Sequence, residues 1–219
     1  MLRFGPAAGP VVVAALPLFE EANRTRAFAV TILRALAGHG IAGLLPDLPG
    51  QGESLVPTHE TDLDMLRTAF AAAAMPAGDR PVFTFAIRSG ALVDTQARVD
   101  AHYHLSPVTG ADLRRELIRT RQASAREAGE TFDPAGIDTA TGPVELAGNL
   151  IAPRLMAQLA TATPSETVAR TVRLETEARP ADAKLPGSPL WRRAEPDNDL
   201  AFAERVADDV AAWIATCAA

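Results

Sequence analysis

The segment AIRSG, which ends in Gly90, follows a predicted strand at residues 81–87 and forms a sharp turn. Serine hydrolases place the nucleophile in the middle of such a turn, with a small residue two positions away on each side. Here the middle residue is Arg88, whose guanidinium stays protonated and cannot attack a carbonyl group. Moving the frame by one residue centres the turn on Ser89, but β-branched Ile87 then occupies a position that needs a small side chain.

Acyl-transfer chemistry also needs a general base, which in the usual chain order is a histidine after the last strand. The histidines of this sequence are His39, His59, His102 and His104, and none lies that late. His102 and His104 alternate along a predicted strand and face the same side, as a metal-binding pair would, but no third ligand has a suitable spacing. We therefore predict that these histidines either pack in the core or are exposed to solvent. We expect no bound metal ion and no cofactor.

Two carboxylates, Glu20 and Glu21, occupy the loop after the first predicted strand, where a hydrolase needs free backbone N–H groups to hold an oxyanion. Negative charge there raises the energy of an oxyanion, although it suits the positive end of the helix that follows. We hypothesise that one of these glutamates forms a charge-assisted pair with Arg88 and fills the pocket. The other candidate pocket residues are Asn23, Arg26, Asp47, Glu53 and Ser89.

Strands and helices alternate along the first half of the chain. Apolar runs predict strands at residues 11–16 and 41–45, and further strands are expected at 81–87 and 100–105. A first helix is expected after the N-cap Asn23. A second begins with a capping-box-like pair formed by Thr61 and Asp64 and ends before Pro76, and a third begins at residues 91–97. This alternation predicts an α/β fold with a mostly parallel sheet, flanking helices and ligand sites at the carboxyl ends of the strands.

The pattern changes at residue 109, and residues 109–163 predict a cap or insertion within one domain that spans residues 1–219. This stretch combines a predicted helix with an arginine-rich face, a loosely structured segment at 123–141, a short hairpin at 144–151 and a helix that begins at Pro153. The arginines of that face are Arg114, Arg115, Arg119 and Arg121. We therefore expect a small layer added above the sheet.

The end of the chain predicts two strands, at 171–176 and 189–194, and a final helix capped by Asn198 or Asp199. The apolar stripe of that helix comprises Phe202, Val206, Val210, Trp213 and Cys217. Cys217 is the only cysteine, so it cannot form an internal disulfide, and we expect a buried packing thiol.

The composition narrows the possible partners. A net charge of −6 argues against a general nucleic-acid binder, because phosphates require a basic field. We find neither an apolar run of membrane-spanning length nor a signal peptide, so we expect a cytoplasmic protein with no transmembrane segment. The partners that remain possible are a small-molecule or glycan-related ligand and another protein. The sequence also leaves open whether the protein forms a homodimer.

Three segments resemble the second type of exosortase A-associated hydrolase, a group within the α/β-hydrolase superfamily. They are LPLFEEANRTR at 16–26, LPDLPGQGES at 45–54 and AIRSGAL at 86–92. Later segments with the same likeness are SPVTG at 106–110, VELAG at 144–148, LIAPRL at 150–155 and PLWRRAE at 189–195. The resemblance implies an α/β-hydrolase-like sheet with a small helical insertion after the sixth-strand position.

The same family is encoded in bacteria beside genes for exopolysaccharide production and protein sorting, which implies an envelope pathway without defining a reaction. This sequence departs from the family pattern at both loops. Leu16 replaces a histidine in the first loop, and Ala86 and Ser89 replace a glycine and a leucine at the turn, whereas Arg88 is retained. One or two edge strands of the full fold are also expected to be short or missing.

Three functions remain from the sequence. The favoured one is a hydrolase-like binding or accessory protein without Ser-His-Asp catalysis. The alternative is an esterase or thioesterase that uses Ser89 with an unrecognised base, so enzyme activity stays open. A third is an interaction module whose arginine-rich helix binds an acidic partner. The simpler explanation of these arginines is a helix face exposed to solvent.

Overall fold

The computed structural model describes residues 1–75 and 78–217 and contains one seven-stranded sheet. The strand order is β1-β3-β2-β4-β5-β8-β9, with β1 antiparallel to β3 and all other neighbours parallel. The strands are β1 (Leu2–Phe4), β2 (Val11–Ala15), β3 (Ala42–Leu45), β4 (Val82–Ile87), β5 (Ala101–Leu105), β8 (Ala169–Leu174) and β9 (Ala183–Leu185). This mostly parallel sheet with flanking helices confirms the predicted fold class.

Strands β2 and β4 lie side by side in the sheet, and every residue of both is buried. Parallel strands that are covered on both faces are almost wholly apolar, and Thr84 of β4 is the one polar residue in these two strands. The register pairs Val11 with Val82 and Ala15 with Ala86, so the two strands end together. The loops that follow them therefore meet at the same edge of the sheet.

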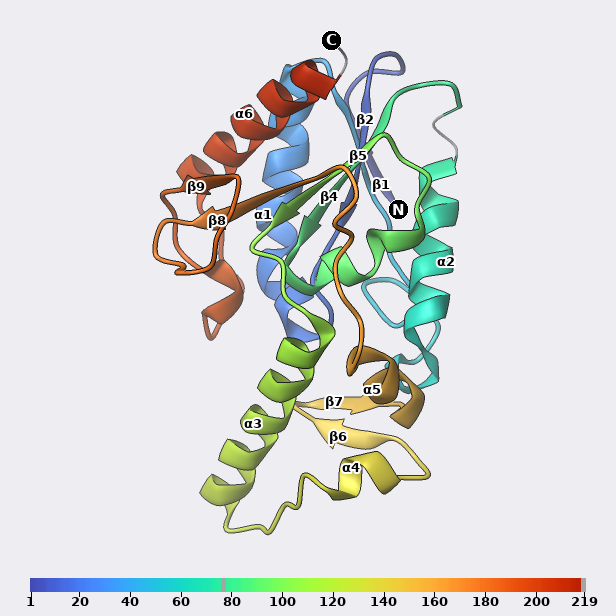
Figure 1. Ribbon diagram of the computed structural model, residues 1–219, viewed down its shortest axis with the longest axis vertical. Coiled ribbons are helices and arrows are strands. Elements are labelled where there is room, and N and C mark those ends of the chain that lie inside the picture. The colour runs from blue at the N-terminus through green and yellow to red at the C-terminus, as the bar shows by residue number, and fades with distance from the viewer. Residues whose placement is uncertain (76–77, 218–219) are drawn as a thin grey trace.

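Helices cover both faces of the sheet (Figure 1). α1 (Glu20–Gly38) and α6 (Leu200–Cys217) pack together on one face, and α2 (Leu63–Ala74) covers the other. Phe28 of α1 stacks on Phe202 of α6 with ring centroids 5.0 Å apart. Asp199 accepts a hydrogen bond from the backbone N–H of Phe202 and caps α6, as predicted. Among the described residues, no helix combines the length and the apolar character needed to cross a bilayer.

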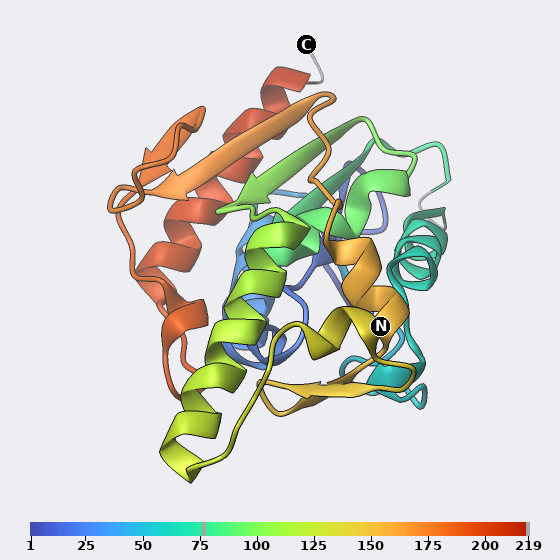
Figure 2. The ribbon, with the colours of Figure 1, turned by 60° about the horizontal axis from the view of Figure 1, so that its bottom comes forward.

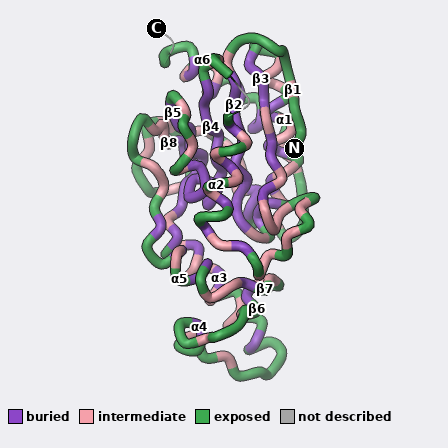
Figure 3. Tube along the Cα trace, turned by 90° about the vertical axis from the view of Figure 1, so that its right-hand side faces the viewer, coloured by how far each residue is buried: buried purple, intermediate pink, exposed green. Residues whose placement is uncertain are grey.

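The chain between β5 and β8 leaves the sheet and lies beyond its carboxyl edge (Figures 1 and 2). It comprises α3 (Gly110–Ala128), α4 (Gly136–Thr139), β6 (Val144–Leu146), β7 (Asn149–Ile151) and α5 (Pro153–Leu159). The predicted hairpin and the helix beginning at Pro153 are both present. The prediction of a loose segment from residue 123 is wrong in its first part, because α3 continues to Ala128 and buries Ala125. Gly129, at a φ of 70°, then ends the helix. Figure 3 shows that the outer end of this layer is largely exposed.

Two predicted helix starts are also wrong. α1 begins at Glu20, so Asn23 lies inside its first turn and the N-cap is Phe19, with no side-chain capping bond. The two glutamates that open this helix suit its positive end. In α2 the cap is Asp62, whose carboxylate accepts from the backbone N–H of Met65, in place of the predicted Thr61. Pro76, the predicted stop of this helix, lies outside the described residues.

The α-helix predicted from residue 91 is replaced by two 3-10 turns, η3 (Arg88–Leu92) and η4 (Asp94–Gln96). These few residues must carry the chain from the end of β4 back to the start of β5. A 3-10 helix rises about 2.0 Å per residue and an α-helix about 1.5 Å, so the tighter form covers this distance with fewer residues. One consequence is that the side chain of Asp94 is fully buried against the sheet.

The strand predicted at residues 189–194 is wrong, since β9 is the edge strand and η5 (Leu190–Arg192) follows it. Pro186 and Pro189 cannot donate to a strand ladder, which disfavours sheet structure there. Cys217 is exposed and not buried as expected, because the last buried residue of α6 is Ile214.

Candidate functional site

The turn after β4 has a strained backbone at Arg88, which adopts a φ of 55°. Non-glycine residues rarely occupy this left-handed region, and its cost is about 1–3 kcal/mol. Gly90 packs so closely that an added Cβ atom would lie 2.3 Å from the carbonyl oxygen of Ala15 on β2. The sharp turn predicted from AIRSG is therefore present, and Arg88 lies at its apex.

The guanidinium of Arg88 is buried and forms ion pairs with carboxylates of two helices. Its Nε and Nη2 lie 3.3 and 3.1 Å from the two carboxylate oxygens of Glu21 on α1. Nη2 also donates to Glu116 on α3, at 3.0 Å. The predicted pairing of Arg88 with a glutamate of the first loop is confirmed for Glu21, whereas Glu20 is exposed.

Burial strongly affects Glu21. It raises the pKa of this carboxyl group above the ordinary value of 4.5, although the charge and hydrogen bonds of Arg88 act in the opposite direction. The pair is thus held in a poorly solvated position where each charge depends on the other. Losing Arg88 would leave the Glu21 carboxylate without its ion-pair partner, whereas Arg88 would still have Glu116.

The loop after β9 completes the surroundings of Arg88. Trp191, in η5, is buried, and the guanidinium carbon of Arg88 lies 5.4 Å from the centre of its ring. This distance fits a cation–π contact, which gains strength when the cation is desolvated. The backbone carbonyl of Trp191 accepts a hydrogen bond from Arg24 of α1, which fixes the loop against that helix.

Ser89 lies directly after Arg88 and is fully buried. Its hydroxyl oxygen accepts a hydrogen bond from the backbone N–H of Leu18, at 2.9 Å. Leu18 belongs to the loop after β2, the position from which a hydrolase donates N–H groups to an oxyanion. In this chain that donor is already engaged by the serine side chain.

An open cavity of about 430 Å³ lies beside Arg88 at the carboxyl ends of the strands. Six arginines and three carboxylates line it, so its wall carries an excess of positive charge. These arginines are Arg88, Arg115, Arg119, Arg173, Arg179 and Arg192, and the carboxylates are Asp112, Glu116 and Glu177. Within the described part of the chain, Arg119 and Arg192 form no ion pair, and both are exposed.

Comparison with known proteins shows what kind of fold presents this arrangement. No family model matches the sequence, and no curated protein matches it either. Est1E from Butyrivibrio proteoclasticus, solved with ferulic acid bound, is 15% identical, with a TM-score of 0.58 over 96% of this chain and 90% of its own. The monoacylglycerol lipase of Paleococcus ferrophilus is 14% identical, with a TM-score of 0.53 over 99% and 98%. This chain has the α/β-hydrolase fold.

Mouse alpha/beta hydrolase domain-containing protein 10 adds a third similar structure, 12% identical with a TM-score of 0.52 over 98% of this chain and 93% of its own. In the α/β-hydrolase fold the nucleophile lies on the strained turn between a strand and a helix, and the catalytic histidine comes last in the chain order. Arg88 occupies that turn here, and the loop after the last strand contributes Trp191. Neither side chain can perform the proton transfer of a Ser-His-Asp triad.

The remaining predicted pocket residues are scattered. Glu20 and Asn23 line a second cavity, of about 240 Å³, between the start of α1 and the loop at residues 49–52. Arg26 and Asp47 form an ion pair of 2.9 Å with each other. Glu53 is exposed. The structure therefore brings together Arg88, Glu21 and Ser89, and leaves the other five outside this group.

The arginine-rich face of α3 mostly holds the added layer together. Arg114 pairs with Asp138 of α4, Arg115 with Asp112, and Arg121 with Glu130 and Glu145. These side chains are therefore largely used within the chain. Arg119 is the member of this face that remains available to a ligand in the described structure, and it points to the cavity of six arginines.

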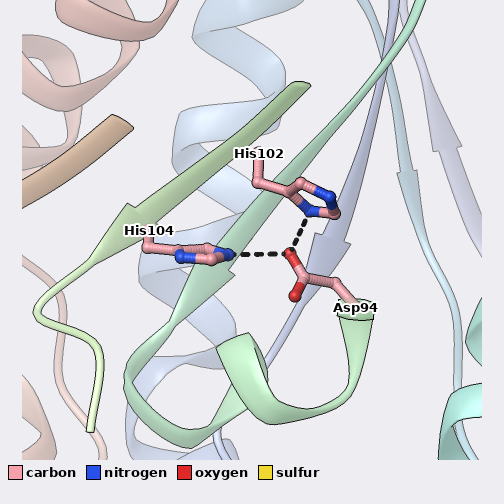
Figure 4. A group of neighbouring side chains, drawn as sticks. All are labelled: Asp94, His102 and His104. Atoms are coloured by element: carbon pink, nitrogen blue, oxygen red, sulfur yellow. Dashed lines mark hydrogen bonds and ion pairs between the residues drawn. The ribbon is translucent and has the colours of Figure 1, made fainter. Parts of the chain in front are cut away.

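The structure also places a third possible ligand beside the histidine pair. Asp94 of η4 lies against His102 and His104 of β5, and all three are buried (Figure 4). The sequence interpretation missed it because an α-helix was expected at residues 91–97. The available signal was an acidic residue directly after the apolar run Ala91-Leu92-Val93.

Proposed function

We propose that this protein binds an anionic small molecule in the arginine-lined cavity and does not catalyse acyl transfer. The observation that carries the proposal is the buried contact of Arg88 with Glu21 and Trp191 at the position where hydrolases hold their reacting groups. A cation held by two carboxylates and an aromatic ring supports a binding role and leaves no group there that could attack a substrate.

The charge of the cavity points to the class of ligand. Guanidinium groups match carboxylates and phosphates through paired hydrogen bonds, and this wall carries twice as many arginines as carboxylates. A volume of about 430 Å³ lies within the range of small-molecule sites. Two of its arginines, Arg119 and Arg192, have no competing ion pair within the described residues.

The resemblance to exosortase A-associated hydrolases narrows this class further. It favours an accessory protein of bacterial exopolysaccharide or protein-sorting pathways, in which sugar phosphates and uronic acids are anionic glycan components. We therefore propose a glycan-related anion as the ligand. The proposal places recognition at the carboxyl ends of the strands, where open α/β sheets bind ligands.

Calorimetric titration tests the binding proposal. Glucose 1-phosphate and glucuronate should bind the wild-type protein more tightly than neutral glucose. Combining Arg119→Gln with Arg192→Gln should weaken anion binding at least about tenfold, since a hydrogen bond to a charged group is worth about 1.5–3 kcal/mol. Arg98→Gln, an exposed arginine that does not line the cavity, serves as the matched control. Equal binding of glucose and the two anions would overturn the proposal.

The esterase alternative is tested on the same protein. It requires Ser89 to attack an ester, yet this hydroxyl is buried and already accepts the N–H of Leu18. We expect no turnover of short p-nitrophenyl esters and no labelling by a fluorophosphonate probe. Labelling that disappears in Ser89→Ala would establish the alternative and contradict the non-catalytic proposal.

A further inference from the structure

A second polar cluster lies within the core, on β4, β5 and the 3-10 turn η4 (Figure 4). One carboxylate oxygen of Asp94, Oδ2, lies 3.0 Å from Nδ1 of His102 and 3.0 Å from Nε2 of His104. The hydroxyl of Thr84 lies 2.6 Å from the same oxygen and 2.9 Å from Nδ1 of His102. Four side chains therefore converge on one small volume inside the protein.

The charge of this cluster is not balanced by any permanent cation of the described chain. Asp94 is fully buried, and its ion-pair partners are the two imidazoles, with no lysine or arginine among them. A buried carboxylate costs several kcal/mol unless a positive group compensates it. The positive charge must therefore come from a protonated imidazole or from a bound cation.

The hydrogen bonding of Asp94 is also uneven. Oδ2 has three partners, whereas Oδ1 is buried and has none. Buried polar atoms in proteins are nearly always satisfied, so an orphaned carboxylate oxygen beside two histidines requires an explanation. A cation bound by the carboxylate would compensate the charge of both oxygens.

The spacing of the three ligand atoms suits a transition-metal ion. All of them lie within 4.8 Å of one another. In tetrahedral zinc sites, ligand bonds of about 2.0–2.1 Å place neighbouring ligand atoms about 3.3 Å apart. The two separations that involve Oδ2 of Asp94, 3.0 Å each, differ from this value by a few tenths of an ångström. Two imidazoles and one carboxylate are also a ligand set that Zn²⁺ and its neighbours accept.

We propose that Asp94, His102 and His104 bind one divalent transition-metal ion, Zn²⁺ in the first instance. The hydroxyl of Thr84 donates to the ligating carboxylate and orients it, as outer-shell partners do. None of these four residues lines the arginine cavity, so the ion has a structural role that is separate from ligand binding. It fastens the short crossover at η4 to β5, where the predicted α-helix is absent.

The first experiment uses the full chain, freed of any affinity tag and carrying Cys217→Ser to remove its exposed thiol. We expect one equivalent of Co²⁺ to bind and to give the strong visible absorption of a tetrahedral site, and Zn²⁺ to displace it. His102→Gln and His104→Gln should each weaken binding by more than the 10–100-fold (about 1–3 kcal/mol) that outer-shell changes cost. His39→Gln, a histidine on the exposed surface, is the matched control and should bind normally.

Two further measurements protect the test against variants that fail to fold. Thr84→Val leaves all three ligands in place and should weaken Co²⁺ binding by about tenfold. On the unmodified chain, a chelator should lower the Tm and one equivalent of Zn²⁺ should restore it. Absence of Co²⁺ absorption in the Cys217→Ser chain would overturn the proposal. So would a protonated His102 or His104, detected by ¹⁵N chemical shifts in protein that resists metal loading.

Discussion

The guanidinium carbon of Arg88 lies 5.4 Å from the centre of the Trp191 ring, and this contact joins the turn after β4 to the loop after β9. The two residues lie far apart in the sequence: one is on the turn where α/β-hydrolases carry the nucleophile, and the other is in the loop after the last strand. Together with Glu21, the ring encloses the charge and limits the exposure of Arg88 to 8%. The contact therefore makes Arg88 part of the packed interior.

Replacing Trp191 tests how much this contact contributes to the stability of the fold. Trp191→Ala removes a buried ring and exposes the Arg88–Glu21 pair, so we expect the free energy of unfolding to fall by about 3–5 kcal/mol. Trp191→Phe retains an aromatic face under the guanidinium and should lose clearly less. Urea denaturation followed by circular dichroism measures both. Equal losses in the two variants would show that the aromatic face contributes nothing beyond volume.

Removing one charge of the buried pair should be far more costly than removing both. Arg88→Met leaves the Glu21 carboxylate buried without its cation, at an expected cost of about 3–5 kcal/mol. Adding Glu21→Leu to the same protein should recover most of that loss, because an apolar pair needs no compensation. A double variant as unstable as Arg88→Met alone would contradict this account of the pair.

Ser89 is expected to act through its hydrogen bond with the loop after β2. Ser89→Ala leaves the backbone N–H of Leu18 without an acceptor in a buried position, which should cost about 1–3 kcal/mol. Ser124→Ala, an exposed serine of α3, is the control and should change stability by less than about 0.5 kcal/mol. The prediction fails if the two alanine variants are equally stable in urea.

The acid sensitivity of the fold should depend on Asp94. Burial alone would raise its pKa, but the hydrogen bonds with His102 and His104 prevail and lower it from 3.8 to about 2. A carboxyl group with a lowered pKa in the folded state stabilises the protein above its unfolded pKa. This contribution, about 2 kcal/mol, is lost as the pH falls from about 3.8 to about 2.

Unfolding free energies of metal-free protein between pH 5 and pH 2, in the presence of a chelator, measure this loss. Asp94→Asn lacks the titrating group, so its stability should fall less steeply over the same interval. Parallel curves for wild-type protein and variant would assign the acid sensitivity to other carboxylates, such as Asp112, whose pKa is also lowered to about 2.

Local sequence patterns were sufficient for much of the fold. The central strand β2 is a continuous apolar run, and Arg88 and Glu21 could be paired because each follows a strand that ends at the same edge of the sheet. Local patterns were insufficient where the structure of a segment depends on contacts with residues far away in the sequence. Trp191 lies in a segment interpreted as a strand, and Glu116 on a helix face interpreted as arginine-rich and solvated, yet both contact Arg88.

Asp94 was missed for a related reason. An apolar run beginning at Ala91 is compatible with either an α-helix or a tighter turn, and the choice depends on the distance that the chain must cover to reach β5. That distance is a property of the assembled sheet. The direction of the Asp94 side chain, and with it the whole histidine cluster, could therefore not be obtained from local periodicity.

The strained apex at Arg88 has a consequence for any redesign of this turn. A serine in place of Arg88 would leave Glu21 buried without its cation, while Trp191 would still cover the apex and Ser89 would still hold the Leu18 amide. A single substitution at the apex would therefore leave neighbours from α1, η5 and the loop after β2 arranged around a side chain that is gone. Residues 21, 88 and 191 form one packed unit, so they would have to change together.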